Sequence, residues 1–167
     1  EIRQAGGSKQ DQENFPGANI LFKNYDKRVI LFHEGALIES NLAYFYAKEN
    51  YFKATGDVVF TQGDTLIMTC KTIEYDGNTK VAIANGKVFL KRPDMSLETE
   101  KLNLDRTTNQ AFYNTRGVVI DSSSKLTSNQ GRYFMNEKKY RFTSNVLINN
   151  PQYKVNSDQL DYYTELN

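Results

Sequence analysis

The sequence predicts an all-β protein built of antiparallel strands. From Ile20 onward, short runs rich in Val, Ile, Phe, Tyr and Thr alternate with polar residues and are cut by Gly, Asn and Asp. This pattern is typical of strands that bury one face. The segment from Leu42 to Ala54 is the nearest candidate for a helix, but its aromatic residues also fit two strands around Lys48 to Asn50. We therefore expect short polar turns and no helix of convincing length.

A repeated phrase supports the same fold class. A small or polar position followed two residues later by a branched apolar residue recurs along the chain, at Ile30, Val58, Val88, Val119 and Val146. Neighbouring markers lie 28, 30, 31 and 27 residues apart. Each copy continues with a small hydroxyl residue, such as Ser40, Thr69, Thr99, Ser128 or Ser157, then an apolar pair, a polar turn and a returning strand. Fixed periods of this length indicate a repeat architecture.

The repeat predicts how the strands associate. Two or three strands bury only one face and are marginal alone, whereas stacked units satisfy each other's backbone groups around one interior. We expect about five units of 27–31 residues rolled into an antiparallel jelly roll. Residues 1–19 are polar and are predicted to be a flexible leader, which leaves residues 20–167 as a single β-domain.

Composition excludes several function classes. The chain has 167 residues with 21 basic and 20 acidic side chains, so its net charge of +1 gives no overall attraction to nucleic acid. Its one cysteine, Cys70, cannot form an internal disulfide. No apolar run approaches the roughly 20 residues of a membrane helix, and the first residues hold no apolar centre of a signal peptide.

Catalytic patterns are scarce, so we expect no enzyme activity, no cofactor and no metal. The lone His33 beside Glu34 is interpreted as a surface residue, and Cys70 as a half-buried strand thiol. The common hydrolase, zinc and phosphate-loop motifs do not occur. Acidic residues are scattered over repeat positions, and none stands out as half of a carboxylate pair for glycoside cleavage.

The apolar faces of the strands remain the main candidate for function. Alternation places Leu102 and Leu104 on one face and Asn103 and Asp105 on the other. Such an interior is either filled by its own side chains, as in a structural domain of a larger envelope protein, or open as a groove for a lipid chain. A groove needs small residues along one seam, for example Ala36, Ala54, Ala84 and Gly131. The sequence allows both interpretations.

The stretch "ALIESNLAYFYAKENYFKATGDVVFTQGDTLIMTCKTIEYDGN" resembles the OstA-like domain shared by the LptA, LptC and LptD lipopolysaccharide-transport proteins. Gly56, Val58, Gln62 and Gly63 fall in place in the family phrase, and looser copies continue the likeness to Tyr163. The variant with "EYDGNTKVA" is similar to the OstA-like proteins of Bacteroidetes. Ser144 stands where a further glycine is expected, which predicts a different turn geometry before Val146.

The resemblance implies a V-shaped β-jelly roll in the periplasm, without catalysis, that shields the acyl chains of lipopolysaccharide between the inner and outer membranes. Its implied partners are lipopolysaccharide and other Lpt-type domains, joined by edge-strand pairing and head-to-tail self-association. Family positions point first to Ile38 and Leu104 as lipid contacts, then to Ala36 and Leu90. The full predicted lipid-binding set is Ala36, Ile38, Leu42, Tyr44, Phe52, Val58, Phe60, Val88, Leu90, Leu102, Leu104, Val119, Tyr140 and Phe142.

Overall fold

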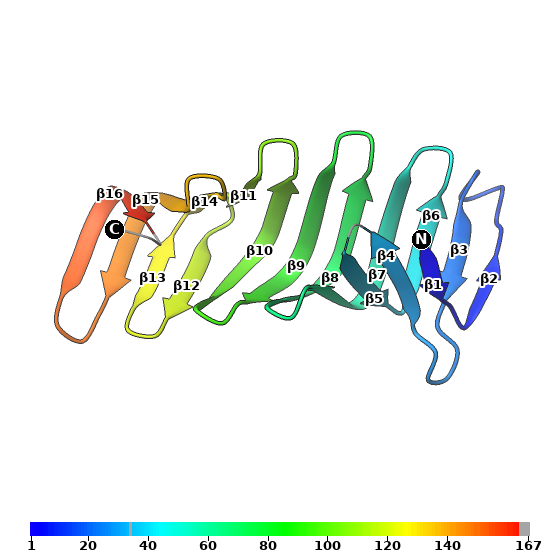
Figure 1. Cartoon of the computed structure of the whole chain (residues 1–167), viewed down its shortest axis with the longest axis horizontal. Coiled ribbons are helices and arrows are strands. Elements are labelled where there is room, and N and C mark those ends of the chain that lie inside the picture. The colour runs from blue at the N-terminus through cyan, green and yellow to red at the C-terminus, as the bar shows by residue number, and fades with distance from the viewer. Residues whose placement is uncertain (34, 164–167) are drawn as a thin grey trace.

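The computed structural model describes residues 1–33 and 35–163, and the regular elements among them are antiparallel β-strands (Figure 1). The strands are β1 (Ile2–Gln4), β2 (Gly7–Lys9), β3 (Asn19–Phe22), β4 (Val29–His33), β5 (Ala36–Ser40), β6 (Leu42–Tyr46), β7 (Tyr51–Gln62), β8 (Leu66–Asp76), β9 (Val81–Lys91), β10 (Met95–Asp105), β11 (Gln110–Tyr113), β12 (Gly117–Asp121), β13 (Lys125–Ser128), β14 (Gln130–Phe134), β15 (Lys139–Asn149) and β16 (Lys154–Tyr163). The described residues contain no helix that could cross a membrane.

Six long strands, β7 to β10, β15 and β16, run through the whole width of the sheet. On one side of β7, β10 and β15, the two halves of the strand pair with different short strands. Residues 51–55 of β7 pair with β6, whereas residues 59–62 pair with β5. The register of β7 against β8 shifts between Thr55 and Val58, where the ladder is interrupted. The strands follow one another along the long axis, from β2 and β3 at one end to β16 at the other (Figure 1).

The divided pairing produces two layers. Layer 1 contains β2, β3, β6, β11 and β14, together with the halves of the long strands that pair with them. Layer 2 contains β1, β4, β5, β12 and β13 with the remaining halves. The line along which the long strands pass from one layer to the other is called the crease. Its paired positions are Val29 with Ser40, Val58 with Cys70, Val88 with Thr99, Gly117 with Ser128, and Val146 with Ser157.

Left-handed backbone marks the crease. Gly56 and Asp57 have φ values of +80° and +48°, and Ser144 and Asn145 have +65° and +54°. The sequence predicted a different turn geometry at Ser144, and this prediction is wrong. Ser144 and Asn145 adopt the same positive φ region as Gly56 and Asp57, although neither is a glycine. Successive crease positions lie 29, 30, 29 and 29 residues apart. The sequence markers Ile30 and Val119 are therefore displaced from the crease, whose positions in those two copies are Val29 and Gly117.

Small polar groups satisfy the backbone at the crease. Ser40 Oγ donates to the Leu42 carbonyl at 3.1 Å, and Ser128 Oγ donates to the Gln130 carbonyl at 2.8 Å. In the second copy the buried residue is Cys70, whereas Thr69, the hydroxyl residue expected from the sequence, is exposed. The prediction for that copy was off by one residue, and a one-residue slip reverses the face of a strand.

The segment predicted to be a flexible leader contributes strands to both layers. Within it, β1 pairs with β4 and β2 pairs with β3. The following residues return over the outside of layer 1, where the Phe15 ring lies 4.7 Å from the Tyr44 ring. These polar residues gain main-chain hydrogen bonds from sheet edges, which composition alone does not reveal.

The core lies between the two layers and is unevenly distributed. Seventeen buried residues form one cluster on the side of β3 to β11, among them Val29, Ile73 and Val88. Only Leu126, Phe142 and Val146 form a second buried cluster, near β13 and β15. The interior is therefore densely packed toward the N-terminal end and sparsely packed toward the C-terminal end.

Candidate functional site

A groove runs between the layers as three adjoining hollows. The N-terminal hollow measures about 40 Å³ and the central hollow about 300 Å³, and both are lined by Phe60, Ile73 and Leu104. The C-terminal hollow measures about 360 Å³ and shares Met95 and Tyr140 with the central one. Neighbouring hollows share lining residues, so they lie side by side along the interior.

Layer 2 supplies a row of large apolar side chains to one wall of this groove. Residues directly opposite one another on adjacent strands point to the same face of a sheet. Following the pairing from β5 to β15 gives the row Ile38, Phe60, Met68, Leu90, Leu97, Val119, Leu126 and Ile148. This wall is apolar from one end of the groove to the other.

Layer 1 supplies a wall with smaller side chains. Ala82 pairs with Leu104, which pairs with Ala111, and nearer the crease Ile73 pairs with Ala84. Gly131 also lines the central hollow, where the Tyr113 ring occupies the space that a Cβ atom would need. Small residues opposite large ones leave space between the layers. Of the small residues predicted to form a seam, Ala84 and Gly131 line this hollow, whereas Ala36 lies in layer 2 and Ala54 is fully buried.

Ten of the fourteen predicted residues line the hollows. Ala36, Ile38, Phe52, Phe60, Leu90, Leu102, Leu104, Val119, Tyr140 and Phe142 belong to this group. Val58 and Val88 are each 1% exposed and lie at the crease, beneath the groove. The structure thus brings most of the set together, and lipid contact by these residues stays a prediction.

The interior position expected for Leu42 and Tyr44 is wrong. In β6, Ala43 pairs with Ala54 and Phe45 pairs with Phe52, and these residues belong to the core or pack against it. Alternation then turns Leu42 and Tyr44 to the outer face, where Tyr44 contacts Phe15. Leu42 to Tyr46 reads Leu-Ala-Tyr-Phe-Tyr. Aromatic residues follow one another in this strand, so the hydrophobic pattern did not reveal which of its side chains point into the core.

Several groove residues were missing from the predicted set. They include Met68, Ile73, Ala82, Ala84, Met95, Leu97 and Tyr133. Most could have been found by extending the alternation from Phe60 and Leu104 to their neighbours on the adjacent strands. That extension needs the pairing register, which bulges at the crease displace by a residue or more.

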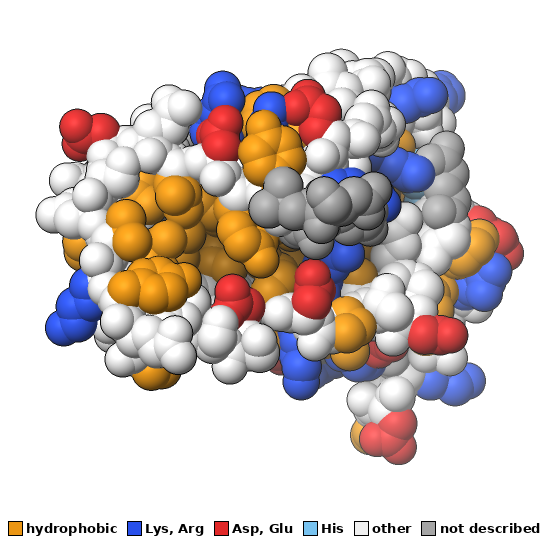
Figure 2. Space-filling view, turned by 60° about the vertical axis from the view of Figure 1, so that its left-hand side comes forward, with side chains coloured by type: hydrophobic (Ala, Val, Ile, Leu, Met, Phe, Trp, Pro, Cys, Tyr) orange, Lys and Arg blue, Asp and Glu red, His pale blue; other side chains and the backbone are white. Residues whose placement is uncertain are grey.

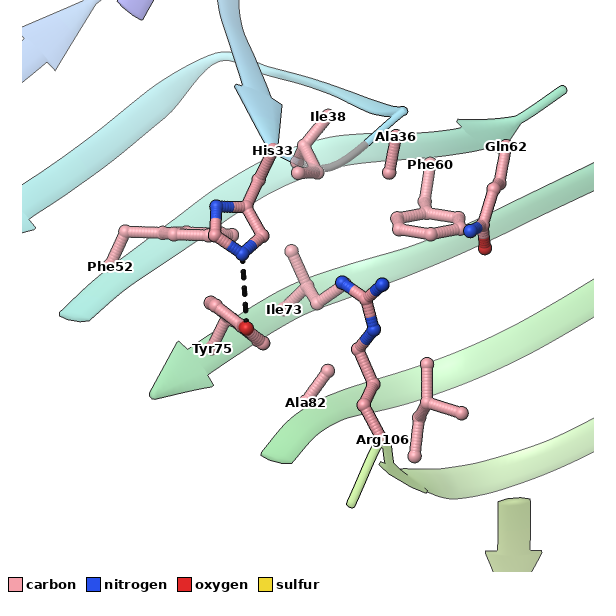
Figure 3. A pocket seen from close by; sticks show the side chains of 11 residues that line it. His33, Ala36, Ile38, Phe52, Phe60, Gln62, Ile73, Tyr75, Ala82 and Arg106 are labelled. Carbon is pink, nitrogen blue, oxygen red and sulfur yellow. Dashed lines mark hydrogen bonds between the residues drawn. The ribbon is translucent and has the colours of Figure 1, made fainter. Parts of the chain in front are cut away.

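Contacts across the groove connect the layers at its mouth (Figure 3). His33, at the end of β4 in layer 2, has its Nε2 atom 3.0 Å from the hydroxyl oxygen of Tyr75 in layer 1. Their ring centroids are 4.7 Å apart. His33 is half-buried, which corrects its interpretation as a surface residue. The N-terminal hollow is therefore narrowed by an aromatic contact between the two walls.

A second contact spans the mouth farther along. The guanidinium carbon of Arg92, in the turn between β9 and β10, lies 6.0 Å from the centroid of the Tyr133 ring in layer 1. Tyr133 and Tyr140 stack at 4.2 Å. Burial, together with the nearby Tyr133 hydroxyl, raises the pKa of Tyr140 to about 12, so its phenol stays neutral. These aromatic side chains form the partition between the central and C-terminal hollows.

The C-terminal hollow opens at the end of the molecule (Figure 2). Hydrophobic side chains gather there in a recessed area of the surface. The lining includes Val119, Phe142, Leu160 and Tyr162. Recessed apolar surface of this kind marks a ligand site or an interface more often than solvent contact.

The described residues offer no evident catalytic centre. They contain no group of three or more His, Cys, Asp or Glu side chains placed to hold a metal ion. Burial raises the pKa of Cys70 to about 11, which keeps the thiol protonated and unreactive near neutral pH. The apolar lining of the hollows is suited to enclosing apolar groups.

The fold and the groove define a class: an antiparallel β-roll with two layers and an apolar interior path. The chain belongs to the OstA-like protein family, whose model matches residues 2–158. A search among curated proteins finds no match. Among solved structures, the chain is similar to LptH from Pseudomonas aeruginosa, described as the LptA homologous periplasmic component of the lipopolysaccharide transport device.

The likeness to LptH extends over the fold. The two are 21% identical with a TM-score of 0.53, and the match covers 59% of this chain and 75% of LptH. At this identity the match shows the fold alone. The predicted all-β, jelly-roll-like architecture and the OstA-like resemblance are confirmed.

Proposed function

We propose that this protein is a non-enzymatic periplasmic module that carries the acyl chains of lipopolysaccharide in its groove toward the outer membrane. The observation that carries the proposal is the set of three adjoining hollows, each lined by members of the apolar row of layer 2. Membership of the OstA-like family and the fold shared with a periplasmic transport component support it.

The physical basis is the removal of hydrocarbon from water. Burial of one methylene gains about 0.8 kcal/mol, so enclosing a chain of ten gains on the order of 8 kcal/mol. The combined central and C-terminal hollows fall within the range of roughly 300–1,000 Å³ typical of ligand pockets. A domain with a filled core is the alternative, and the two unfilled hollows favour the groove over that alternative.

Site-specific photocrosslinking tests the proposal. A photoreactive amino acid at Leu104 or Phe60, both in the groove, should form adducts with lipopolysaccharide in cells that make it. Ile67 is the matched control, because it is a large apolar residue on the outer face and is 48% exposed. Equal adducts at all three positions, or none at the groove positions, would contradict lipid carriage.

We further infer that the ends of the roll pair with other Lpt-type domains or with a second copy. Within the described chain β16 pairs only with β15, and β2 only with β3, so each presents an unpaired edge. Exposed edges of this kind accept an added strand. Size measurements at rising protein concentration should reveal open-ended growth, and a monomer at every concentration would contradict self-association.

A further inference from the structure

All three methionines of the chain line the central hollow. They are Met68, Met95 and Met135. Met68 and Met95 belong to the parts of β8 and β10 that lie in layer 2, and Met135 directly follows β14 in layer 1. The fold therefore gathers every thioether of the protein at one hollow, although the three residues are far apart in the sequence.

The three side chains lie at different depths. Met68 is two residues from Cys70, a crease position, and is 7% exposed. Met95 begins β10 at the end away from the crease, and Met135 lies in the turn between β14 and β15. Both are half-buried. Met95 and Met135 thus lie at the free margins of the two layers, which border the mouth of the hollow.

Packing alone explains only the deepest of the three. Methionine often fills irregular gaps in a core, and Met68 belongs to the large buried cluster. Met95 and Met135 border a space of about 300 Å³ that the side chains of the protein leave unfilled. A small solute that enters this space meets their sulfur atoms, which makes the pair candidates for chemical modification.

The remaining sulfur of the protein is poorly placed to react. Cys70 is 7% exposed, and burial raises the pKa of its thiol to about 11, so little thiolate is present near neutral pH. A methionine thioether is oxidised without first losing a proton, so its oxidation depends on access. Sulfur oxidation is therefore expected at the mouth of the central hollow rather than at the crease.

We propose that Met95 and Met135 are sites of oxidation by hydrogen peroxide, and that their sulfoxides reduce the capacity of the central hollow to hold hydrocarbon. This inference rests on the proposed function and adds a means of regulating it. A sulfoxide is polar and disrupts apolar contact surfaces. Hydrocarbon that covers its oxygen removes water from a polar group without replacing the lost hydrogen bonds, which weakens binding.

The reaction needs no group beyond the thioether and the peroxide. A lone pair of the sulfur attacks one peroxide oxygen, and the O–O bond breaks as the S–O bond forms. The departing hydroxide takes the proton that the transferred oxygen loses, so the products are one sulfoxide and one water. The sulfur is oxidised and the peroxide is reduced.

Binding of dodecyl maltoside, an uncharged amphiphile, to the purified chain before and after peroxide treatment tests the inference. Peroxide should weaken binding about tenfold, the size expected for one uncompensated polar group. M95L/M135L nearly conserves side-chain volume, so its affinity should start within about twofold of the unchanged protein and should change less than about twofold on treatment. Mass spectrometry of peptides should find the added oxygen at Met95 and Met135 before Met68.

M68L is the matched control, because it makes the same replacement at the buried position. It should remain as sensitive to peroxide as the unchanged protein. Methionine sulfoxide reductases with a dithiol reductant should restore binding to the oxidised chain. An equal loss of affinity in M95L/M135L and in the unchanged protein would assign the effect to other side chains and overturn the inference.

The two proposals fail in different ways. If the chain binds dodecyl maltoside and oxidation of both methionines leaves the affinity unchanged, the oxidation inference is wrong while carriage of hydrocarbon stands. If the untreated chain does not bind, the proposed function is contradicted, and this inference with it. Thermal unfolding of the oxidised chain should stay cooperative, and loss of the folded state on oxidation would also overturn a local effect at the hollow.

Discussion

The two ends of the roll have the same backbone plan but different interiors. Toward the N-terminal end, Phe52, Ile73 and Tyr75 are all buried in the large core cluster, and the hollow there measures about 40 Å³. Toward the C-terminal end, the buried cluster has three members and the hollow measures about 360 Å³. The same strand plan therefore leaves the space between the layers nearly filled at one end and open at the other.

This contrast suggests a division of roles along one sheet. The dense end contributes most of the buried apolar surface, which is the main source of folding free energy. The hollow end leaves apolar surface incompletely covered, a cost in stability that suits a binding site. Four experiments follow from the contrast, and they are arranged by the size of the expected effect.

Truncation of the core should affect the two ends unequally. Ile73 is 2% exposed in the dense end, and I73A should lower the free energy of unfolding by about 3 kcal/mol, within the usual range for a buried isoleucine. Leu160 is half-buried beside the C-terminal hollow, and L160A should cost only about 1 kcal/mol because less surface is lost there. Urea unfolding of both variants measures the difference, and equal losses would refute the contrast.

Thiol reactivity should distinguish the same two regions. Burial raises the pKa of Cys70 from 9.0 to about 11, so at pH 8 its thiolate fraction is about 100-fold below that of an ordinary thiol. A second cysteine can be introduced by L160C in a background where Cys70 is replaced by Ser. Alkylation of Cys70 in the unchanged protein should be slower than alkylation of that introduced cysteine by a similar factor. Similar rates for the two cysteines would contradict the protected state of the dense end.

The same shift has a consequence for stability. The pKa of the Cys70 thiol is higher in the folded protein than in the unfolded chain. Its contribution to the free energy of unfolding is therefore fully present below about pH 9 and is lost as the pH rises through about 11. Urea unfolding of the unchanged protein at pH 8 and pH 10.5 should therefore show a larger decrease in stability than the same measurement on C70S. An equal decrease in both would indicate that Cys70 does not titrate with a raised pKa.

The smallest expected effect concerns the crease. Ser128 is 1% exposed, donates to the Gln130 carbonyl and lies 2.6 Å from the Tyr113 hydroxyl. S128A leaves both partners buried without it and should cost about 1–2 kcal/mol. Ser157 makes the corresponding bond to the Gln159 carbonyl at the exposed end strand, so S157A should change stability by less than about 0.5 kcal/mol. A reversed order of the two losses would exclude burial as the cause.

The repeat was visible in the sequence because each crossing of the crease requires the same types of residue. Val58, Val88 and Val146 are all buried there, opposite Cys70, Thr99 and Ser157. In two other copies, Ser40 and Ser128 donate hydrogen bonds to backbone carbonyls at the crease. Prediction from the sequence failed where the local pattern was ambiguous. Ala43 faces inward between Leu42 and Tyr44, although both neighbours have larger side chains.

The predicted groove residues were found for a related reason. Leu102 and Leu104 alternate cleanly with polar neighbours, and both line the central hollow. Arg92 and Arg106 could not be anticipated, because both lie just beyond strand ends, where alternation carries no information. Their approach to the groove depends on how the turns fold back over its mouth.

By itself the sequence determined the strand-rich class, the spacing of its units and the absence of common catalytic motifs, since these follow from local periodicity and residue type. Tertiary structure decided the division into two layers, the face of each ambiguous strand and the openness of the interior. Those properties depend on which residues meet across the groove. Ala82 and Ala111 come to line the same hollow as Phe60 and Leu90 only because the two layers bring these strands together.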